Sequence, residues 1–413
     1  MRLSLKFYPK LSQEQLNIIE ELSFHTTKLY NIANYENVSH GYRFYVDMQS
    51  YLKDNWHREY LHSHTYQQCL KVLEQDWKSF FSASKDYNKN PNKYSGKPQM
   101  PWYKNGTRKN QVIFTNFAIR SKGNTIILSL SQKMQKLFGV KSLNLILPKS
   151  VLERMNKSLH QIRCCWDISK KIWYMIIICK QEEVKLPEDY FNTMAIDLGL
   201  DNLCACTFLH SEEQYLLSGK SLKSKNSYYN KEIARLTRIQ MKGTGSKNFK
   251  RTNKMKTLQI KRNNTMNDGL HKASKYVVDL AITHKCHTIV IGDIKGIKKE
   301  NNSKSFVQIP IQRMVTLIKY KAELNGIKIE LINEAYTSGV SAFDLEPIDK
   351  ASYNIKRRIN RGLFVSEGGH YVNSDINGSL NIMRKYESKV LPMPIRRLRD
   401  NGCLDQPVRI LIA

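Results

Sequence analysis

The alternation of hydrophobic and polar residues divides the first part of the chain into a short strand and long helices. Residues 1–8 alternate with the two-residue period of a half-buried strand. Ser12 and Gln15 then form a capping box, which predicts the start of a helix. Apolar residues at helical spacing mark the buried faces of this helix and of a second one: Leu16, Ile19 and Leu22, then Leu70, Leu73, Trp77 and Phe80.

Strand-like segments dominate the chain from residue 111 to residue 180. They are residues 111–120, 124–131, 142–148, 160–169 and 171–180. The last two are joined by Ser-Lys-Lys and predict a long hairpin. With residues 1–8, we expect these strands to close a small barrel. The acidic, proline-containing segment 182–192 predicts a linker to a second domain.

The second half alternates strands and helices, as an α/β domain does. Residues 193–208 predict strand, turn and strand, and residues 212–219 a third strand. Further along, the chain predicts the helix 267–284, the strand 287–291, the helix 311–326, the strand 327–333, a hairpin across Gly368-Gly369 and a helix at 373–386.

A strongly basic composition points to nucleic acid as the partner. Lys+Arg is 66 and Asp+Glu is 36, so the formal net charge is 66 − 36 = +30. Phosphate neutralisation with counterion release drives the binding of such proteins to RNA and DNA. The helical stretch 220–264 carries many cations, including Lys250, Arg251 and Lys254, against the single acid Glu232. We expect it to follow a nucleic-acid backbone; a solvated charged face is the alternative.

The segment 86–110 is a loop by composition and mixes lysines with aromatic residues. Lys97, Trp102, Tyr103 and Lys104 would suit a nucleic-acid strand, with phosphates on cations and bases on rings. A solvated loop with aromatic anchors fits the same composition equally well.

No apolar run reaches the ~18 residues of a membrane span, so we expect no membrane partner and a location in the prokaryotic cytosol or nucleoid. The eight cysteines are scattered without a C-x-x-C pair, which favours reduced, buried thiols.

Carboxylates stand at three junctions of the second half: Asp197, then Asp293 or Glu334, then Asp375. Singly, each has an ordinary interpretation as a turn residue, a solvated strand end or a helix N-cap. Together they fit an RNase H-like sheet with an acid on the first strand, one on a later parallel strand and one on a final helix. Such a cluster is typical of a site for two Mg²⁺, with Mn²⁺ possible, about 3.5–4 Å apart.

The segments "MAIDLGLDNLCACTF", "IVIGDIKGI" and "YTS…NSDINGSLNIMRK" resemble the three RuvC segments of the TnpB family, the transposon-encoded relatives of type V CRISPR effectors. The resemblance extends over nearly the whole chain, including "MRLSLKFYP" and "GKPQMPWYKN". It implies an RNA-guided DNA endonuclease, with guide RNA and double-stranded and single-stranded target DNA as partners, acting as a monomer or as a homodimer on RNA.

One departure from the TnpB pattern concerns the second carboxylate. Most members have Glu where this chain has Gly292. Successive strand residues point to opposite faces, so Asp293 would point away from the cluster. Glu334 ends the neighbouring strand and can reach the same pocket. We therefore predict Asp197, Glu334 and Asp375 as catalytic metal ligands and Asp293 as a turn residue.

The other departure concerns zinc. Residues 335–374 contain no cysteine, and His370 alone cannot make a tetrahedral zinc site, so we expect a zinc-free hairpin region there. Arg357, Arg358 and Arg361 give that region a phosphate-facing character.

The expected fold class is multidomain α+β: a barrel-like wedge domain at 1–181 with a helical recognition insertion at about 11–110, then a RuvC-like α/β domain at 193–386. The latter would contain a basic helical insertion at 220–285, followed by a basic tail at 387–413. Two other functions remain open. One is a nuclease-inactive RNA-guided DNA-binding protein, such as a repressor, and the other is a transposase that acts without RNA.

Overall fold

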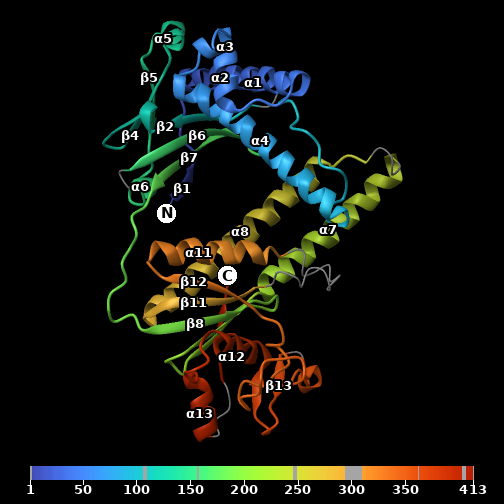
Figure 1. Ribbon diagram of the computed structural model, residues 1–413. Coiled ribbons are helices and arrows are strands. Elements are labelled where there is room, and N and C mark those ends of the chain that lie inside the picture. Colours follow the sequence, from blue (N-terminus) through green and yellow to red (C-terminus); the bar gives the residue numbers. More distant parts are fainter. Residues whose placement is uncertain are drawn as a thin grey trace. The chain divides into compact units, whose positions relative to one another are not determined.

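A computed structural model of the protein describes residues 2–105, 109–155, 158–244, 249–293, 309–360, 362–401 and 406–412. The chain divides into two compact units, Met1–Glu182 and Glu183–Ala413 (Figure 1). The division falls at the start of the predicted linker 182–192. The wedge, recognition and nuclease roles expected for these ranges stay predictions.

The first unit contains an antiparallel four-stranded sheet in the order β1-β7-β6-β2. Its strands are β1 (Arg2–Phe7), β2 (Val112–Thr115), β6 (Leu159–Asp167) and β7 (Ile172–Lys180). The predicted alternation in β1 is confirmed, since Leu3, Leu5 and Phe7 are buried and the residues between them are exposed. The predicted β6–β7 hairpin is also confirmed.

A separate antiparallel sheet follows β2 in sequence, and the expectation of one closed barrel is therefore not confirmed. Its strands are β3 (Ile119–Lys122), β4 (Thr125–Ser129) and β5 (Ser142–Ile146). The predicted strand 111–120 is in fact two strands, because the 3-10 turn η2 (Asn116–Ala118) interrupts it. The described strands thus hydrogen-bond as two sheets rather than as one continuous ladder.

Helices lie between β1 and β2, where the helical insertion was expected. They are α1 (Gln13–His40), α2 (Tyr45–Tyr51), α3 (Trp56–Glu59) and α4 (Ser63–Lys89), followed by the 3-10 turn η1 (Pro91–Lys93). Two short helices, α5 (Gln132–Phe138) and α6 (Lys149–Leu152), come after β4 and β5. The capping box is confirmed: the Ser12 hydroxyl accepts from the Gln15 amide at 3.2 Å, and the Gln15 side chain accepts from the Ser12 amide at 2.8 Å.

The second unit is built on a six-stranded sheet in the order β12-β11-β8-β9-β10-β15. The strands are β8 (Asn192–Asp197), β9 (Asn202–Phe208), β10 (Gln214–Ser218), β11 (Cys286–Asp293), β12 (Lys328–Asn333) and β15 (Val408–Leu411). β8, β9 and β10 are antiparallel, whereas β11 and β12 run parallel to β8. This is the strand pattern that the RNase H-like expectation requires.

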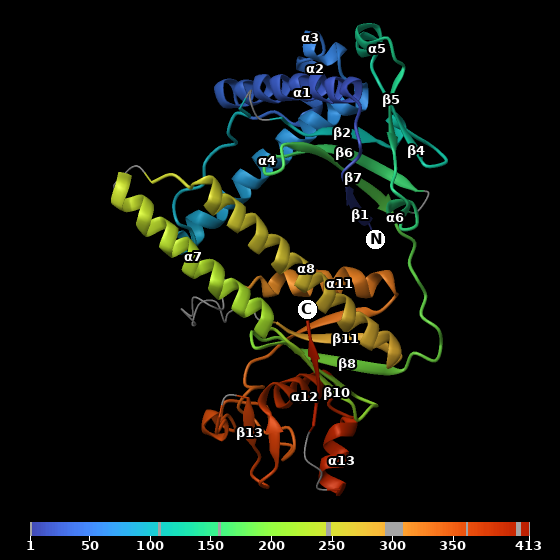
Figure 2. The same cartoon turned by 180° about the vertical axis from the view of Figure 1, so that it is seen from behind.

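Helices cover both faces of this sheet. α8 (Asn253–Thr283) and α11 (Ile311–Leu324) lie on one face, and α12 (Ser374–Tyr386) lies on the other (Figures 1 and 2). α7 (Lys220–Thr244) pairs with α8 as a helical hairpin. The short strands β13 (Leu363–Val365) and β14 (Tyr371–Asn373) form the predicted hairpin around Gly368 and Gly369, after the turn η4 (Ile355–Arg357).

The period of the strands sorts their side chains between the two faces. Met194 and Ile196 belong to the core under α8 and α11, whereas Ala195 belongs to the core under α12. Asp197, two residues after Ala195, therefore lies on the same face of the sheet as Ala195. In β11, Val290 lies in the same core as Ala195. Gly292 comes two residues later, so it also lies on the face that α12 covers.

Two sequence-based expectations were wrong, and the structure adds detail to a third segment. The sequence predicted a helical stretch 220–264 and a separate helix 267–284, but one helix, α8, runs unbroken from Asn253 to Thr283. β11 extends past residue 291 to Asp293, which pairs with Asn333, so Asp293 is a strand residue rather than a turn residue. The predicted basic tail 387–413 contains α13 (Met393–Asn401) and β15, and β15 pairs with β10.

Candidate active site

Asp197 lies at the end of β8, at the centre of the sheet, on the face covered by α12. The helix approaches it closely at Gly378, where an added Cβ would lie 2.8 Å from Asp197 Oδ2. Burial raises the pKa of the Asp197 carboxyl well above its usual range, and the nearby carboxylates of Asp375 and Glu334 raise it further. The structure therefore brings the electrostatic influence of all three predicted acids to one place.

Asp375 lies in the first turn of α12 and is not the N-cap. Asn373 has that position, and its side-chain oxygen accepts from the backbone N–H groups of Asp375 and Ile376 at 3.0 and 3.3 Å. The Asp375 carboxylate contacts other groups: Asn202 Nδ2 donates to Oδ2 at 2.8 Å, and Arg358 Nη2 lies 3.6 Å from Oδ1. With Asn373 as the cap, the Asp375 side chain is available at the site.

Glu334 follows the last residue of β12 and fills space that Gly292 leaves open. A Cβ built on Gly292 would lie 2.6 Å from Glu334 Oε2 and 2.9 Å from Ile382 Cδ1. The carboxylate of Glu334 thus lies directly beside the position where most TnpB-like chains carry a Glu side chain. Burial raises the pKa of Glu334 to about 7, and the Asp293 carboxylate contributes to the rise.

Lys385 lies near the same corner of the site. Its ammonium donates to the backbone oxygens of Asn333 and Ala335, at 3.1 and 2.6 Å. These bonds tie the turn after β12 to α12 and so fix where Glu334 leaves the sheet. The positive charge of Lys385 also opposes the rise in the Glu334 pKa.

The donor chemistry of Asp197, Glu334 and Asp375 fits a hard divalent cation, because carboxylate oxygens are the ligands that Mg²⁺ takes. Burial first, and then repulsion from Asp375 and Glu334, raises the pKa of Asp197, and a bound cation would relieve both effects. In the part of the chain that the structure describes, no three His, Cys, Asp or Glu side chains are already placed to hold a metal ion. The three acids would have to converge further to bind one.

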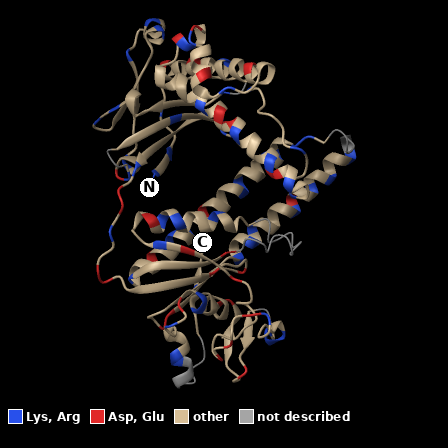
Figure 3. Cartoon of the chain, in the orientation of Figure 1, with Lys and Arg blue, Asp and Glu red and all other residues tan. Residues whose placement is uncertain are grey.

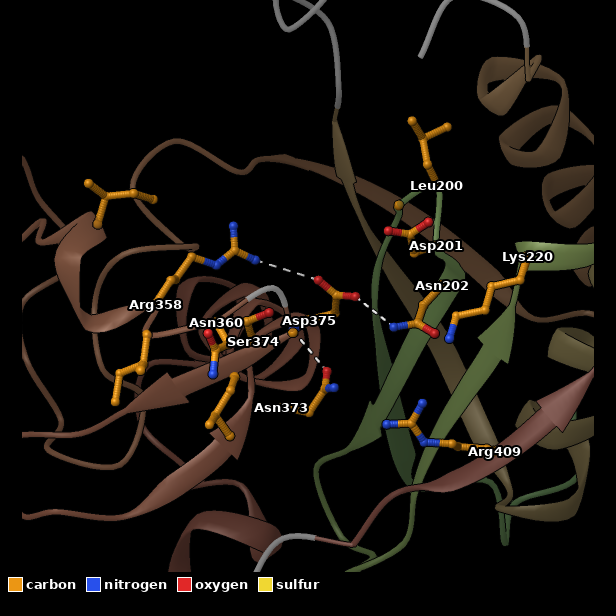
Figure 4. A pocket seen from close by; sticks show the side chains of 15 residues that line it. Leu200, Asp201, Asn202, Lys220, Arg358, Asn360, Asn373, Ser374, Asp375 and Arg409 are labelled. Carbon is orange, nitrogen blue, oxygen red and sulfur yellow. Dashed lines mark hydrogen bonds and ion pairs between the residues drawn. The ribbon is translucent and has the colours of Figure 1, made fainter. Parts of the chain in front are cut away.

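A cavity of about 1120 Å³ opens beside Asp375 (Figure 4). Basic and amide side chains from separate segments line it, among them Lys220, Arg358 and Arg409. The Gly199 turn and the N-terminus of α12 complete its wall. Its size and cations suit a chain of phosphates.

The cysteine-free segment between β12 and β14 is held by polar side chains of α12. Asn377 accepts from the Ala342 amide at 2.9 Å and donates to the Val340 oxygen at 2.8 Å. Asn381 donates to the backbone oxygens of Thr337 and Val340, and Arg384 donates to the oxygen of Glu346. A compact core that includes Phe343 and Val372 completes the packing.

The three arginines of the cysteine-free segment that we predicted to face phosphate have different surroundings. Arg357 is ion-paired with Glu346 and with Glu367, which ties it to its own segment, and its contact with phosphate stays a prediction. Arg358 lines the cavity and faces Asp375. Arg361 lies outside the described residues.

The aromatic loop of the first unit is anchored to α1 with its rings exposed. Asn31 exchanges two hydrogen bonds with the backbone of Lys104, at 2.8 and 2.7 Å, and Asn34 donates to the Pro101 oxygen at 2.8 Å. Trp102 and Tyr103 are 79% and 52% exposed. The backbone is thus fixed while the rings stay available, as a stacking surface requires.

The lysines of this loop are also accessible. Lys97 is exposed, and the Lys104 ammonium lies 3.5 Å from Asp76 and above the ring of Tyr30. In the second unit Lys250, Arg251 and Lys254 are exposed around the start of α8. Figure 3 shows further cations along α7 and α8. Nucleic-acid binding by all these residues stays a prediction.

Sequence reasoning missed several residues of the site. The Asn202 contact with Asp375, the close approach at Gly378 and the Arg409 contribution from β15 all join segments far apart in the chain. One signal was available for Gly378: it lies three residues after Asp375 and therefore on the same helix face.

The order and directions of the strands β8 to β12 are those of an RNase H-like sheet. Residues 177–298 match the OrfB_IS605 family, described as a probable transposase, and residues 312–382 match the Cas12f1-like TNB domain. The chain therefore carries a TnpB-like transposase domain followed by a Cas12f-type TNB domain, and it is a distant relative of the Cas12f proteins.

Two curated relatives illustrate the distance. The CRISPR-associated endodeoxyribonuclease Cas12f1 of Sulfoacidibacillus thermotolerans is 26% identical over 256 residues, which cover 60% of this chain and 59% of that protein. Cas12f2 of a Micrarchaeota archaeon (strain CG1_02_47_40) is 24% identical over 254 residues, 56% of this chain and 44% of that protein. The chain thus spans about three fifths or less of the length of these relatives.

Solved structures share the fold. A Cas12f1–sgRNA–target DNA complex superposes with a TM-score of 0.60 at 17% identity, over 90% of this chain and 83% of that one. The mini-RNA-guided endonuclease CRISPR-Cas_phi3 gives a TM-score of 0.52 at 9% identity, over 93% and 92%. In the described part of the chain, no helix is both long and apolar enough to cross a bilayer.

Proposed function

We propose that the protein is an RNA-guided DNA endonuclease of the TnpB type, which cleaves target DNA beside a short flanking motif. The observation that carries the proposal is the placement of Asp197, Glu334 and Asp375 at the same end of one face of an RNase H-like sheet, where Asp375 and Glu334 act on the pKa of Asp197. The domain matches support it, as do relatives named endodeoxyribonucleases and a similar fold solved with sgRNA and target DNA. In such a protein, base pairing with the guide reads the target sequence.

Glu334 is proposed as the second carboxylate because its position compensates for Gly292. The two residues lie on neighbouring parallel strands, and strand period places both on the face of Asp197. The carboxylate oxygen of Glu334 is 2.6 Å from the place of a Cβ at residue 292. A glutamate supplied from β12 therefore occupies the pocket that a glutamate on β11 would otherwise enter.

In this proposal Asp197, Glu334 and Asp375 hold the divalent metal, Mg²⁺ or Mn²⁺, which when bound activates water and stabilises charge on the phosphodiester. Asn202 keeps Asp375 oriented, and Lys385 fixes the turn that carries Glu334. Lys220 and Arg409 bind the phosphates of the strand in the adjacent cavity. The cysteine-free segment 335–374 is proposed to fold without zinc.

The test is reconstitution with a guide RNA and a library of flanking motifs. We expect cleavage of matched DNA in Mg²⁺, no cleavage of mismatched DNA, and no cleavage by Asp197→Asn or Asp375→Asn. Target binding, measured by filter retention, should survive both substitutions because the base-paired guide supplies it.

One observation favours a second candidate function. The three acids are not already placed to hold a metal among the described residues. An RNA-guided DNA-binding protein without nuclease activity would bind the matched target in the same assay and leave it intact. Strand transfer of DNA ends without RNA would instead indicate a transposase.

A further inference from the structure

The two oxygens of Asp375 have partners of different kinds. Asn202 donates a hydrogen bond of 2.8 Å to Oδ2, whereas Arg358 Nη2 lies 3.6 Å from Oδ1, beyond hydrogen-bond distance. The Arg358 and Asp375 side chains are 33% and 27% exposed. One oxygen is therefore fixed by geometry, and the other is balanced by a charge that water can reach.

The guanidinium of Arg358 also acts on the rest of the carboxylate cluster. Its charge opposes the rise in the pKa of Asp197 that burial causes and that Asp375 and Glu334 increase. Arg358 belongs to the segment just after η4, outside any helix or strand. It lines the cavity, and in Figure 4 it faces the side of Asp375 opposite to Asn202. The cavity leaves space into which the Arg358 guanidinium can turn away from Asp375.

We propose that Arg358 is an exchangeable counter-ion of the carboxylate site. It neutralises Asp375 while no divalent cation is bound, competes with that cation for Oδ1, and turns into the cavity when the cation binds. A guanidinium and a metal ion carry charge of the same sign, so they do not share one carboxylate oxygen at close range. The proposal rests on the proposed function in one respect, that the three acids bind a divalent metal.

The proposal accounts for the spread of the three acids. With Arg358 at Oδ1, the partly exposed charge of Asp375 is already balanced, and the carboxylates have no cation around which to converge. Displacement of Arg358 would allow Asp375 to approach Asp197, with Asn202 still holding Oδ2.

The experiment measures Mn²⁺ affinity by electron paramagnetic resonance on the full chain freed of nucleic acid, so that no cleavage enters the readout. Asp375→Asn gives the binding that does not involve the site, and this baseline is subtracted. We expect Arg358→Gln to bind Mn²⁺ about threefold to fivefold more tightly than wild type, the size of a partly exposed ion pair. Arg358→Lys, which keeps the charge, should stay near wild type.

Arg409→Gln is the matched control, because Arg409 lines the same cavity from β15. Its substitution should leave Mn²⁺ affinity unchanged and weaken the binding of single-stranded DNA. Equal tightening by Arg409→Gln would overturn the proposal, because the effect would then be one of overall charge. Unchanged or weaker Mn²⁺ binding by Arg358→Gln would also overturn it, as would the absence of site-specific binding in every variant. The proposed function would fail separately, if guided cleavage were absent from a protein that binds Mn²⁺.

Discussion

At the scale of single residues, the candidate site depends on two glycines that leave room for carboxylates. Gly378 lets α12 approach Asp197, and Gly292 lets Glu334 enter the site. A side chain at either position would meet carboxylate oxygen at less than 3 Å, as the distances of 2.8 and 2.6 Å indicate. The absence of these two side chains explains how three acids reach one face of the sheet.

The Gly292–Glu334 arrangement predicts the outcome of an exchange. Gly292→Ala should lower the cleavage rate by about 10- to 100-fold, because it displaces the Glu334 carboxylate and small misplacements of a catalytic group cost about that much. The double variant Gly292→Glu with Glu334→Ala should recover part of the activity lost in Glu334→Ala. Gel-based cleavage rates with a matched target measure both effects.

Gly368→Ala is the control, since its Cβ would meet its nearest neighbour, Asp344, at an ordinary 3.5 Å. Normal cleavage by Gly292→Ala would contradict the steric argument. A double variant as inactive as Glu334→Ala would mean that the two positions do not serve the same ligand role.

A second residue-scale prediction concerns a buried histidine pair. His25 Nδ1 and His57 Nδ1 lie 2.9 Å apart, and His25 Nε2 lies 3.1 Å from Glu21 Oε1. Burial lowers the pKa of each histidine from 6.5 to about 4. The unfolded chain then binds protons that the folded chain does not, so stability is complete above pH 6.5 and is lost as the pH falls toward 4.

The free energy of unfolding of the first unit should therefore fall by at most about 1.4 kcal/mol per pH unit for each histidine in this range. Urea unfolding of wild type and of His57→Gln measures the effect. The variant should be less stable at neutral pH and show a shallower pH dependence. An identical slope in both proteins would mean that the pair does not titrate as described.

At the scale of elements, α12 organises the cysteine-free segment 335–374. Asn377, Asn381 and Arg384 lie on one side of the helix and bind the backbone between residues 337 and 346. In the same segment, Asp344 accepts from the amides of Glu367 and Gly368, in the turn between β13 and β14, at 2.7 and 3.2 Å. These hydrogen bonds hold the described part of the segment through contacts within the protein.

We therefore predict that elemental analysis finds no stoichiometric zinc and that a chelator leaves the melting temperature unchanged. Asn381→Ala should destabilise the second unit by about 1–3 kcal/mol, because the Thr337 oxygen loses its side-chain donor and the Val340 oxygen keeps only the one from Asn377. Asn360→Ala, at an exposed position, is the control. One zinc per chain, or melting that responds to the chelator, would contradict the prediction.

The order and type of the elements could be predicted from the sequence, because strand and helix periods are local. Hydrophobic runs such as residues 286–291 and 171–180 are strands, and the capping box at Ser12 begins a helix. The interruption at Asn116–Ala118, the continuity of α8 and the pairing of β15 with β10 could not be predicted in this way. They depend on tertiary contacts, which no short window contains.

The same limit applied to the site. The side of the sheet on which Glu334 lies follows from strand period, and the prediction used that rule. The assignment of Asp293 to β11 depends on the length of that strand, which the sequence did not reveal. The pairing of Arg358 with Asp375 depends on a fold that brings together residues 17 positions apart.

At the scale of the whole molecule, the net charge of +30 requires a polyanionic partner or a screening solvent. Cations along α7 and α8 give the charge a defined location in the second unit (Figure 3). We predict that the protein purifies with RNA and that the nuclease-protected RNA maps beside its own gene. Affinity for this RNA should fall steeply with salt, because counterion release drives the binding.

Sequencing of the copurified RNA tests this prediction. The recovery of random cellular RNA in place of one dominant species would count against guided activity. A variant with Lys250, Arg251 and Lys254 changed to Gln should retain less RNA, whereas Glu334→Gln should retain as much as wild type.

The assignment of the second carboxylate to Glu334 is the central claim, and cleavage of a matched DNA target in Mg²⁺ by three substituted proteins tests it most directly. Glu334→Gln should lose cleavage nearly completely while binding RNA and target normally, because the amide keeps the shape and removes the charge. Asp293→Asn should cut almost as wild type does. Glu330→Gln, on the same strand and paired with Lys328, serves as the control. An inactive Asp293→Asn beside an active Glu334→Gln would contradict the account and make the end of β11 the catalytic one.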